Sequence, residues 1–197
     1  MKIYENILYL QDVKYIVNLN LPWNRLFNKS IMISGATGLI GSMLIDVLME
    51  KNNHGLNCTI FALGRSQSRM INRFKYCFDN PLFNFIEYDV NKKLDLDKNL
   101  NVDYILHLAS NTHPMQYSTD PIGTITTNII GLQNLLDFAV EHNTSRFAFA
   151  SSNEIYGENR GDVEKFDEKY CGYIDCNTMR AGYPESKRCG EALCQAY

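Results

Sequence analysis

A tyrosine and a lysine stand four residues apart near the end of the chain, Tyr183 and Lys187, in the sequence Tyr-Pro-Glu-Ser-Lys. Residues at this spacing share one face of a helix, so the phenol and the ammonium would lie close together. An ammonium stabilises a neighbouring phenolate, which can then accept a proton. The same spacing also fits a surface helix with a packed ring and a solvated amine. The rest of the sequence decides between these two interpretations.

A second motif consists of Gly35, Gly38 and Gly41, which follow an apolar segment at 31–33. At a nucleotide pyrophosphate, the first glycine of such a series permits a tight turn, the second lets backbone amides approach phosphate oxygens, and the third lets a helix pack against the sheet. The phosphate then lies at the helix N-terminus. The spacing differs by one residue from G-x-G-x-x-G, and glycines alone can mark a simple strand-to-helix turn. The order of strand, glycines and helix favours the phosphate site.

A third motif, Ser-Ser-Asn-Glu-Ile-Tyr-Gly at 151–157, lies between the other two. A hydroxyl at Ser152 and a carboxylate at Glu154 are groups that exchange protons in enzyme sites. For Glu154 the alternative is a solvated loop carboxylate. The three motifs together predict an enzyme that binds a dinucleotide.

The segments that position these motifs alternate between strand and helix signals. Strands are expected near 30–34, 58–63, 83–88, 103–109 and 146–151. The helix after the glycines has an expected apolar face of Leu39, Ile40, Met43, Leu44, Val47 and Leu48. This alternation predicts an α/β fold, a doubly wound parallel sheet with right-handed crossovers, Rossmann-like.

Two further segments flank this pattern. Residues 1–29 read as a helical extension that covers the domain or forms an oligomer contact, with apolar positions at Ile7, Leu8, Tyr15, Ile16 and Leu19. Residues 30–197 form the expected dinucleotide-binding domain. The stretch 157–179 is long, polar and irregular, and a loop of that length is usually functional.

Composition narrows the function. The 197 residues carry a net charge of -3, which argues against a nucleic-acid partner. No apolar run reaches the roughly 20 residues of a membrane span, and the start lacks the apolar core of a signal peptide, so we expect a cytoplasmic protein without a membrane partner. The six cysteines form no C-x-x-C pair, so reduced thiols and no metal site are expected. His107, inside an apolar strand, is expected to be a packed core residue.

On these motifs, residues 30–197 resemble the extended short-chain dehydrogenase/reductase family, and within it the NAD(P)-dependent nucleotide-sugar epimerases, dehydratases and decarboxylases. The resemblance covers the three glycines, Tyr88-Asp89-Val90, His107-Leu108-Ala109-Ser110, Thr127-Asn128-Ile129-Ile130-Gly131, the segment 151–157 and the pair Tyr183/Lys187. The segment 180–197 looks most like UDP-glucuronate decarboxylases and the dTDP-glucose 4,6-dehydratase-like proteins around them. The resemblance implies an enzyme of this group.

The resemblance implies NAD or NADP as cofactor. The expected contacts are Gly35, Thr37, Gly38, Leu39, Ile40, Gly41, Arg65, Asp89, Val90, Leu108, Ala109, Ser110, Lys187 and, in a supporting role, Asn128. NAD enzymes usually place an acidic residue after the second strand, where this chain has Gly64 and Arg65. An arginine there can pair with a 2′-phosphate or stack on adenine, which favours NADP. Against this, enzymes that return the hydride to the same substrate commonly keep NAD bound. Asp89 and Val90 are expected beside the adenine, with a plain strand-end turn as the alternative for Asp89.

The resemblance also implies catalytic roles. Tyr183, as phenolate, would remove the proton of a sugar C4 hydroxyl while hydride leaves C4, and Lys187 would stabilise the phenolate and bond the nicotinamide ribose. Ser152 would bond the C4 oxygen and shuttle its proton. Oxidation at C4 acidifies the C5 hydrogen, which Glu154 could remove.

Asn153 bears on the type of reaction. In dTDP-glucose dehydratases an acidic residue at this place protonates the departing C6 hydroxyl, and an amide cannot do so. Decarboxylases pair a hydroxyl residue with Glu and need no such acid, since a β-keto acid loses carbon dioxide unaided, although Asn153 departs from their pattern too. The sequence indicates a decarboxylase or dehydratase, with an epimerase next.

Other classes stay open: a simple ketone reductase, or a noncatalytic dinucleotide-binding sensor on the same fold. Such sensors usually lose the Tyr or the Lys. The expected partner is a nucleotide sugar. In the resembled family the chain continues beyond this helix into a substrate domain, which we expect to be absent here. Apolar surface that such a domain would cover is then exposed, which predicts a homo-oligomer. This chain alone is expected to be inactive.

Overall fold

Five short apolar segments pair as parallel strands of one sheet in the computed structural model, which describes residues 3–112 and 114–197. The strands are β1 (Ser30–Ser34), β2 (Thr59–Gly64), β3 (Phe83–Glu87), β4 (Tyr104–His107) and β5 (Arg146–Phe149), in the spatial order β3-β2-β1-β4-β5. All five expected strands are confirmed. β4 ends earlier than expected because the N–H groups of Leu108 and Ala109 turn to the Ser34 hydroxyl, each at 3.1 Å.

Helices alternate with the strands. The α-helices are α1 (Ile7–Val17), α2 (Leu39–Asn53), α3 (Gln67–Phe74), α4 (Pro114–Thr119), α5 (Pro121–Glu141) and α6 (Gly182–Ala196). Short 3-10 helices are η1 (Ile3–Glu5), η2 (Trp23–Leu26), η3 (Lys75–Cys77), η4 (Asn153–Tyr156) and η5 (Met179–Ala181). The alternation and the all-parallel sheet confirm the predicted doubly wound, Rossmann-like α/β fold.

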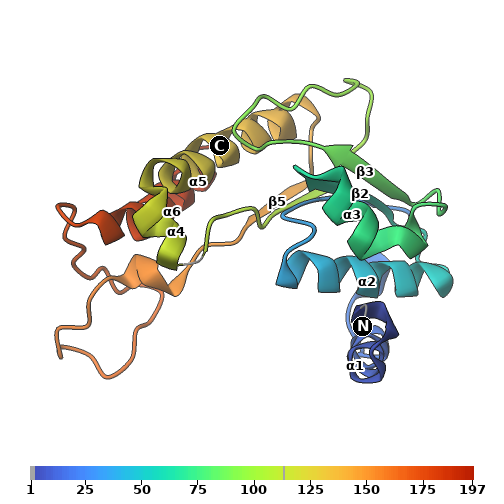
Figure 1. Cartoon of the computed structure of the whole chain (residues 1–197), viewed down its shortest axis with the longest axis horizontal. Coiled ribbons are helices and arrows are strands. Elements are labelled where there is room, and N and C mark those ends of the chain that lie inside the picture. The colour runs from blue at the N-terminus through green and yellow to red at the C-terminus, as the bar shows by residue number, and fades with distance from the viewer. Residues whose placement is uncertain (1–2, 113) are drawn as a thin grey trace.

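Helices cover both faces of the sheet (Figure 1). Because side chains alternate along a strand, Ile33 points to one face and Met32 to the other. The Ile33 face packs against α2 and α3, and the Met32 face packs against α5 through Leu135 and Phe138. The carboxyl ends of the strands therefore lie between two helical layers, and the loops that leave them carry the sequence motifs.

The N-terminal helix α1 packs on α2 rather than on the sheet (Figure 1). The segment is helical, as expected. Of its expected apolar positions, Ile7, Leu8 and Tyr15 are 72%, 71% and 69% exposed, so they do not cover the domain. Val13 and Val17, one turn apart, take the inner face instead and pack with Val47 of α2.

A polar cluster also joins α1 to the domain. The carboxylate of Asp46 on α2 accepts hydrogen bonds from Tyr9 of α1, Arg73 of α3 and Tyr76 of η3. Arg73 also donates to the Tyr9 hydroxyl at 2.8 Å. The Asp46 and Arg73 side chains are only 6% and 14% exposed. One buried carboxylate thus connects four segments.

The start of α2 differs from the expected amphipathic pattern. Leu39 and Ile40 are 88% and 61% exposed, so they do not belong to the apolar face. The helix meets the sheet through Gly41, Ile45 and Leu48, which are buried and follow each other at helical spacing. The expected apolar positions Val47 and Leu48 are buried as predicted.

The segment between Gly157 and η5 is irregular, as expected, and holds one isolated antiparallel bridge, Glu158 to Tyr173. Arg188 of α6 fastens it: the guanidinium donates to the Ile155 carbonyl at 2.6 Å and to the Gly172 carbonyl at 2.7 Å. α6 therefore holds this loop and the 151–157 motif together.

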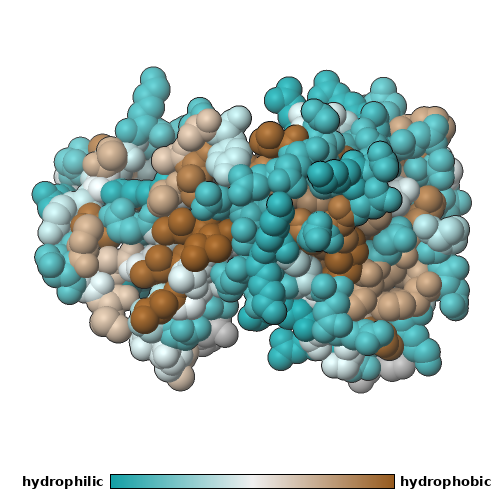
Figure 2. Space-filling model, turned by 90° about the horizontal axis from the view of Figure 1, so that it is seen from above, coloured by the Kyte–Doolittle hydropathy of each residue, from teal (hydrophilic) through white to brown (hydrophobic). Residues whose placement is uncertain are grey.

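Some apolar side chains stay on the surface, among them Ile122, Ile130 and Val140 of α5. Figure 2 shows separate apolar patches divided by polar residues. In the described part of the chain, no helix combines the length and the apolar character that crossing a membrane requires. All six cysteines are free thiols.

Candidate functional site

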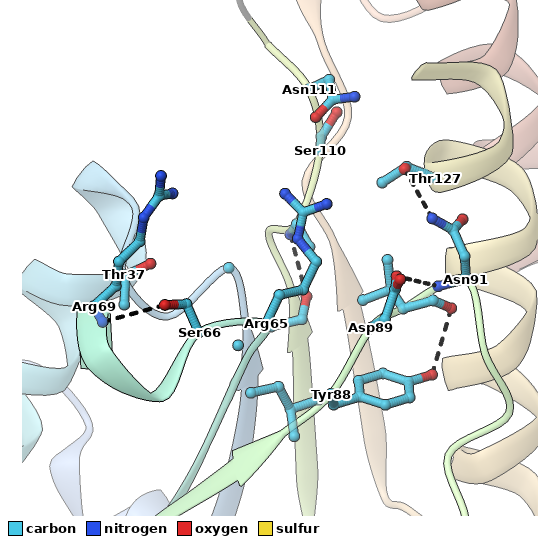
Figure 3. Close-up of a pocket in the computed structure, with 16 residues that line it drawn as sticks. Thr37, Arg65, Ser66, Arg69, Tyr88, Asp89, Asn91, Ser110, Asn111 and Thr127 are labelled. Atoms are coloured by element: carbon cyan, nitrogen blue, oxygen red, sulfur yellow. Dashed lines mark hydrogen bonds between the residues drawn. The ribbon is translucent and has the colours of Figure 1, made fainter. Parts of the chain in front are cut away.

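A cavity of about 170 Å³ opens at the carboxyl ends of β1, β2, β3 and β4 (Figure 3). Seven of its lining residues were expected at a dinucleotide: Gly35, Thr37, Arg65, Asp89, Val90, Ala109 and Ser110. In doubly wound sheets, ligands bind at this edge, where the strand order reverses between β1 and β4. Four loops far apart in the sequence thus build one pocket.

The glycine loop borders this pocket through Gly35 and Thr37 and is closely packed against backbone at Gly35 and Gly41. Gly35 has a φ of 68°, and a Cβ there would lie 2.9 Å from the backbone of Leu108 and Ala109. A Cβ on Gly41 would lie 2.5 Å from the Gly35 carbonyl oxygen. The N-cap of α2 is Gly38, whose missing side chain leaves the first N–H groups of the helix without a side-chain cap. Such N–H groups are suited to a phosphate.

Ser34 holds the two central strand ends beneath the loop. Its hydroxyl accepts the N–H groups of Leu108 and Ala109 and lies 2.6 Å from Nδ1 of His107. Since two donors already occupy the oxygen, the hydroxyl proton points to Nδ1. Burial lowers the pKa of His107 to about 3, so the ring is neutral. The expectation of a packed, hydrogen-bonded histidine is confirmed.

The end of β3 lines the other side of the pocket. Asp89 accepts the N–H of Asn91 at 3.1 Å, as a strand-end turn residue does, and its side chain also borders the cavity. Val90 is buried and packs against Gly131 of α5, where a Cβ would lie 2.8 Å from a Val90 methyl. Both residues line the cavity, and their contact with an adenine stays a prediction.

Asn128 of α5 is fully buried between the pocket and α6. Its side-chain oxygen accepts the Ser110 hydroxyl at 2.7 Å, and its NH₂ donates to Ser186 at 2.9 Å. Both ends of the amide are therefore satisfied by protein. Asn128 does not line the cavity; it connects the loop after β4 to the helix that carries the Tyr/Lys pair.

Tyr183 and Lys187 lie on the buried side of α6, 6% and 2% exposed, so the interpretation as a surface helix with a solvated amine is wrong. The Tyr183 ring stacks on Tyr117 of α4, with centroids 4.6 Å apart. The Lys187 ammonium donates to the Ala150 carbonyl at 2.7 Å and lies 5.9 Å from the Tyr183 ring centroid. The pair faces the strand end from which the 151–157 motif leaves.

Burial makes Lys187 an unusual lysine. Its pKa falls to about 8, because the ammonium loses its hydration. The ammonium lies 4.5 Å from the Phe149 ring centroid, and Phe149 stacks on the neutral His107. In these poorly hydrated surroundings the charged ammonium would attract a neighbouring anion more strongly than in water.

The 151–157 motif begins η4 next to this pair. The Ser152 hydroxyl accepts the Glu154 N–H at 3.2 Å and so caps the turn. Glu154 lies 3.3 Å from Arg180 and borders a second cavity of about 280 Å³, which Arg180 and Pro184 also line. Asn153 is exposed. Tyr183 and Lys187 line neither of these two cavities, and Lys187 is bonded to Ala150, two residues before Ser152.

Residues 31–197 match the NAD dependent epimerase/dehydratase family. The chain belongs to this family. The match includes the glycine loop, the 151–157 motif and the Tyr/Lys helix, and it confirms the resemblance stated from the motifs and the dinucleotide cofactor that it implies.

Individual members of the group are similar over most of this chain. UDP-glucuronic acid decarboxylase 4 of Arabidopsis thaliana is 32% identical over 167 residues, covering 85% of this chain and 35% of the plant enzyme. UDP-N-acetylglucosamine 4-epimerase of Methanobrevibacter ruminantium has the same fold, with a TM-score of 0.68, 22% identity and coverage of 86% of this chain and 50% of the epimerase. The dTDP-glucose 4,6-dehydratase of Bacillus anthracis also has this fold, with a TM-score of 0.63 and 20% identity. The match covers 86% of this chain and 50% of the dehydratase. The chain thus spans about a third to a half of the length of these relatives.

The residues present fit a dinucleotide, because the N-terminus of α2 has no side-chain cap and the loop before it borders the cavity through Gly35 and Thr37. Besides Asn128, six residues expected at the cofactor do not line the cavity: Gly38, Leu39, Ile40, Gly41, Leu108 and Lys187. Within residues 3–112 and 114–197, no three His, Cys, Asp or Glu side chains are placed to hold a metal.

Three residues near the site were missed from the sequence. Tyr117 lies in a short helix without a motif, and only the structure brings it against Tyr183. Arg188 follows Lys187 directly and could have been noted as a cation near the loops. Arg69 lines the dinucleotide cavity, and its position four residues after Arg65 was a readable signal.

Proposed function

We propose that residues 30–197 form the dinucleotide-binding domain of a nucleotide-sugar-modifying enzyme that acts by transient oxidation of a sugar C4 carbon, of the decarboxylase or 4,6-dehydratase type. The observation that carries the proposal is the burial of Tyr183 and Lys187 on one side of α6, beside the strand end that carries Ser152 and Glu154. Titratable groups that the fold buries beside polar and acidic loop residues are candidates for an active site.

In this mechanism Tyr183 accepts the proton of the C4 hydroxyl. Lys187 stabilises the phenolate by its charge, and the stacked Tyr117 keeps the ring in place. The bound dinucleotide supplies the hydride acceptor for C4. Ser152 bonds the C4 oxygen and passes on its proton.

Glu154 acts after oxidation. A C4 ketone acidifies C5, so in a dehydratase the Glu154 carboxylate would remove the C5 proton. In a decarboxylase the C5–C6 bond breaks, carbon dioxide leaves with C6, and a protonated Glu154 would return a proton to the enolate carbon C5. Asn153 cannot protonate a departing hydroxyl, which favours decarboxylation over dehydration. The similarity to UDP-glucuronic acid decarboxylases supports the same choice. A UDP-uronate is accordingly the first substrate to test.

Two other functions compete. A 4-epimerase or an NADP-dependent reductase would use the same Tyr/Lys pair without a need for Glu154. A noncatalytic dinucleotide sensor needs neither, and the burial of both residues against the loops argues for catalysis. We further propose that the protein works in the cytoplasm, as a homo-oligomer, on a nucleotide sugar.

The test combines a cofactor measurement with two variants. Mass spectrometry of the purified protein should find a dinucleotide, and the complete protein should convert UDP-glucuronate. Tyr183→Phe should lower the rate of cofactor reduction by orders of magnitude with little change in binding, because only the proton acceptor is removed. Glu154→Gln should stop product formation yet leave transient reduced cofactor.

Tyr15→Phe is the matched control, since Tyr15 is exposed on α1, outside both cavities. Full activity of Tyr183→Phe would refute the mechanism. Unchanged turnover by Glu154→Gln would instead leave an epimerase or a reductase.

A further inference from the structure

Two arginines line the dinucleotide cavity where the adenosine ribose is expected, and any role for them there rests on the proposed dinucleotide-binding function. Arg65 follows β2 directly, and Arg69 lies in the first turn of α3. In Figure 3 both side chains extend in the same direction, one from the strand end and the other from the helix start. The β2 end is the place where dinucleotide-binding domains distinguish a ribose hydroxyl from a ribose phosphate.

Neither guanidinium is engaged by the protein. Within the described residues, no hydrogen bond or ion pair involves the side chain of Arg65 or Arg69, and both are exposed. The arginines that hold the fold differ: Arg73 pairs with Asp46, and Arg188 binds two carbonyls. The two pocket arginines therefore keep all their donors for a ligand.

The pocket also lacks the acceptor that NAD requires. An acidic side chain after β2 would bond the ribose hydroxyls, but Gly64 and Arg65 stand there. A Cβ at Gly64 would lie 2.9 Å from the terminal methyl of Met70, the end of a flexible side chain. The carboxylate lining this cavity is Asp89, which follows β3 and accepts the Asn91 N–H. The ribose end thus carries two positive charges.

The start of α3 adds polar groups beside the arginines. The Ser66 hydroxyl caps the helix by accepting the Arg69 N–H at 3.3 Å and lies 3.0 Å from the Ser68 hydroxyl. Ser66 also lines the cavity. A phosphate placed between the two guanidiniums would gain charge-assisted hydrogen bonds and lie near the positive end of the helix.

We propose that Arg65 and Arg69 bind a ribose 2′-phosphate, so that this chain prefers NADP over NAD although its family is described as NAD dependent. Arg65 provides the contact at the strand end and Arg69 the contact from the helix. The site is a specificity determinant and takes no part in the Tyr183 chemistry.

Isothermal titration calorimetry of the chain with NADP⁺, NAD⁺, 2′,5′-ADP and 5′-AMP tests the proposal without any turnover. NADP⁺ should bind at least about tenfold more tightly than NAD⁺, and 2′,5′-ADP more tightly than 5′-AMP. Arg65→Ala and Arg69→Ala should each weaken NADP⁺ about tenfold or more, the loss expected for one charge-assisted contact, and leave NAD⁺ within about twofold.

The control is Arg25→Ala, which removes an exposed arginine before β1, at the opposite edge of the sheet. It should leave the ratio of the two affinities unchanged, and Arg69→Lys should keep part of the preference. Circular dichroism should report folded variants, since both pocket arginines are exposed. NAD⁺ binding as tightly as NADP⁺, or an equal effect of both alanine variants on the two ligands, would overturn the proposal and leave the proposed function intact. Failure to bind either dinucleotide would overturn both.

Discussion

At the scale of single residues, the buried ammonium of Lys187 has a measurable cost. Its pKa is about 8 in the folded chain and 10.5 when unfolded. Between these values the unfolded state holds more protons than the folded state, so the free energy of unfolding rises with pH. Below pH 8 the burial cost is present in full, and it is relieved as pH rises toward 10.5.

We therefore expect the parent chain to gain stability relative to Lys187→Met between pH 8 and pH 10, by up to about 1.4 kcal/mol per pH unit. Urea unfolding at several pH values measures the free energy of unfolding of both chains. In the difference between the two values, the titration of groups that both chains share cancels. Lys14→Met, on the exposed side of α1, is the control and should show no such slope. A parallel pair of curves for Lys187→Met and parent would contradict the burial of a charged amine.

The residue types and their spacing predicted the candidate Tyr/Lys pair, but they did not predict which residues contact it. The Tyr183/Lys187 spacing predicted a shared helix face, and the structure places both on the buried side of α6. The carbonyl that binds Lys187 and the ring that stacks on Tyr183 could not be read, because Ala150 and Tyr117 belong to separate elements. Their roles depend on the tertiary fold.

At the scale of elements, the glycines of the loop before α2 have two different roles: Gly38 gives a phosphate access to the helix N-terminus, and Gly41 lets α2 pack closely on the loop. Gly38 has an ordinary φ of -72°, and a Cβ there would lie 3.1 Å from the Gly35 carbonyl oxygen, so a side chain obstructs the phosphate at a small cost in packing. A Cβ at Gly41 would lie only 2.5 Å from the same oxygen, which is a clash with backbone. Gly38→Val should abolish dinucleotide binding and leave the chain folded, with a smaller loss of stability than Gly41→Ala.

Gly41→Ala should instead destabilise the chain by about 1–3 kcal/mol, the usual cost of overpacking, because α2 must shift from the loop. Calorimetric binding and thermal unfolding of the two variants distinguish these effects. If Gly38→Val unfolds the chain while Gly41→Ala leaves its stability unchanged, the division of roles is wrong.

The Asp46 cluster gives a second prediction for elements. Asp46→Ala leaves Arg73 buried without its counter-charge, which should lower the free energy of unfolding by about 3–5 kcal/mol. Tyr9→Phe removes only the hydroxyl from α1. It should increase hydrogen exchange within α1 while the strands keep their protection.

Asp12→Ala, at an exposed position of α1, serves as the control for charge on that helix. Loss of protection in the strands of Tyr9→Phe would show that α1 does not open separately. If the free energy of unfolding of Asp46→Ala equalled that of Asp12→Ala, the Asp46 cluster would make no net contribution to stability.

At the scale of the molecule, the sequence predicted the sheet and its flanking helices better than it predicted which side chains of α1 and α2 are exposed. Strand and helix alternate with clear periodicity, so the doubly wound sheet followed from pattern and handedness. The face of α1 did not follow, because its apolar residues lie all around the helix. Val13 and Val17 are buried against α2, and Tyr9 and Ile16 pack beside them. Nor could the pattern show that Leu39 and Ile40 stay exposed, since that depends on how α2 approaches the sheet.

The exposed apolar residues bear on the proposed self-association. A standard interface buries about 800 Å² on each partner, which needs an extended surface. α5 has 21 residues, so it is roughly 30 Å long and carries exposed Ile122, Ile130 and Val140. α1 has 11 residues and is about half as long, although it also exposes Ile7, Leu8, Leu10 and Tyr15. α5 is therefore the better candidate for the contact.

We expect the chain to sediment as an oligomer at micromolar concentration in analytical ultracentrifugation. Ile130→Glu should shift it toward the monomer, because a buried carboxylate without a partner opposes association. Leu8→Glu, which adds the same charge on α1, should leave the oligomer intact. A monomeric parent chain would refute the proposed homo-oligomer. Dissociation by Leu8→Glu alone would move the contact to α1, the helix that the sequence already marked as either a cover or an oligomer contact.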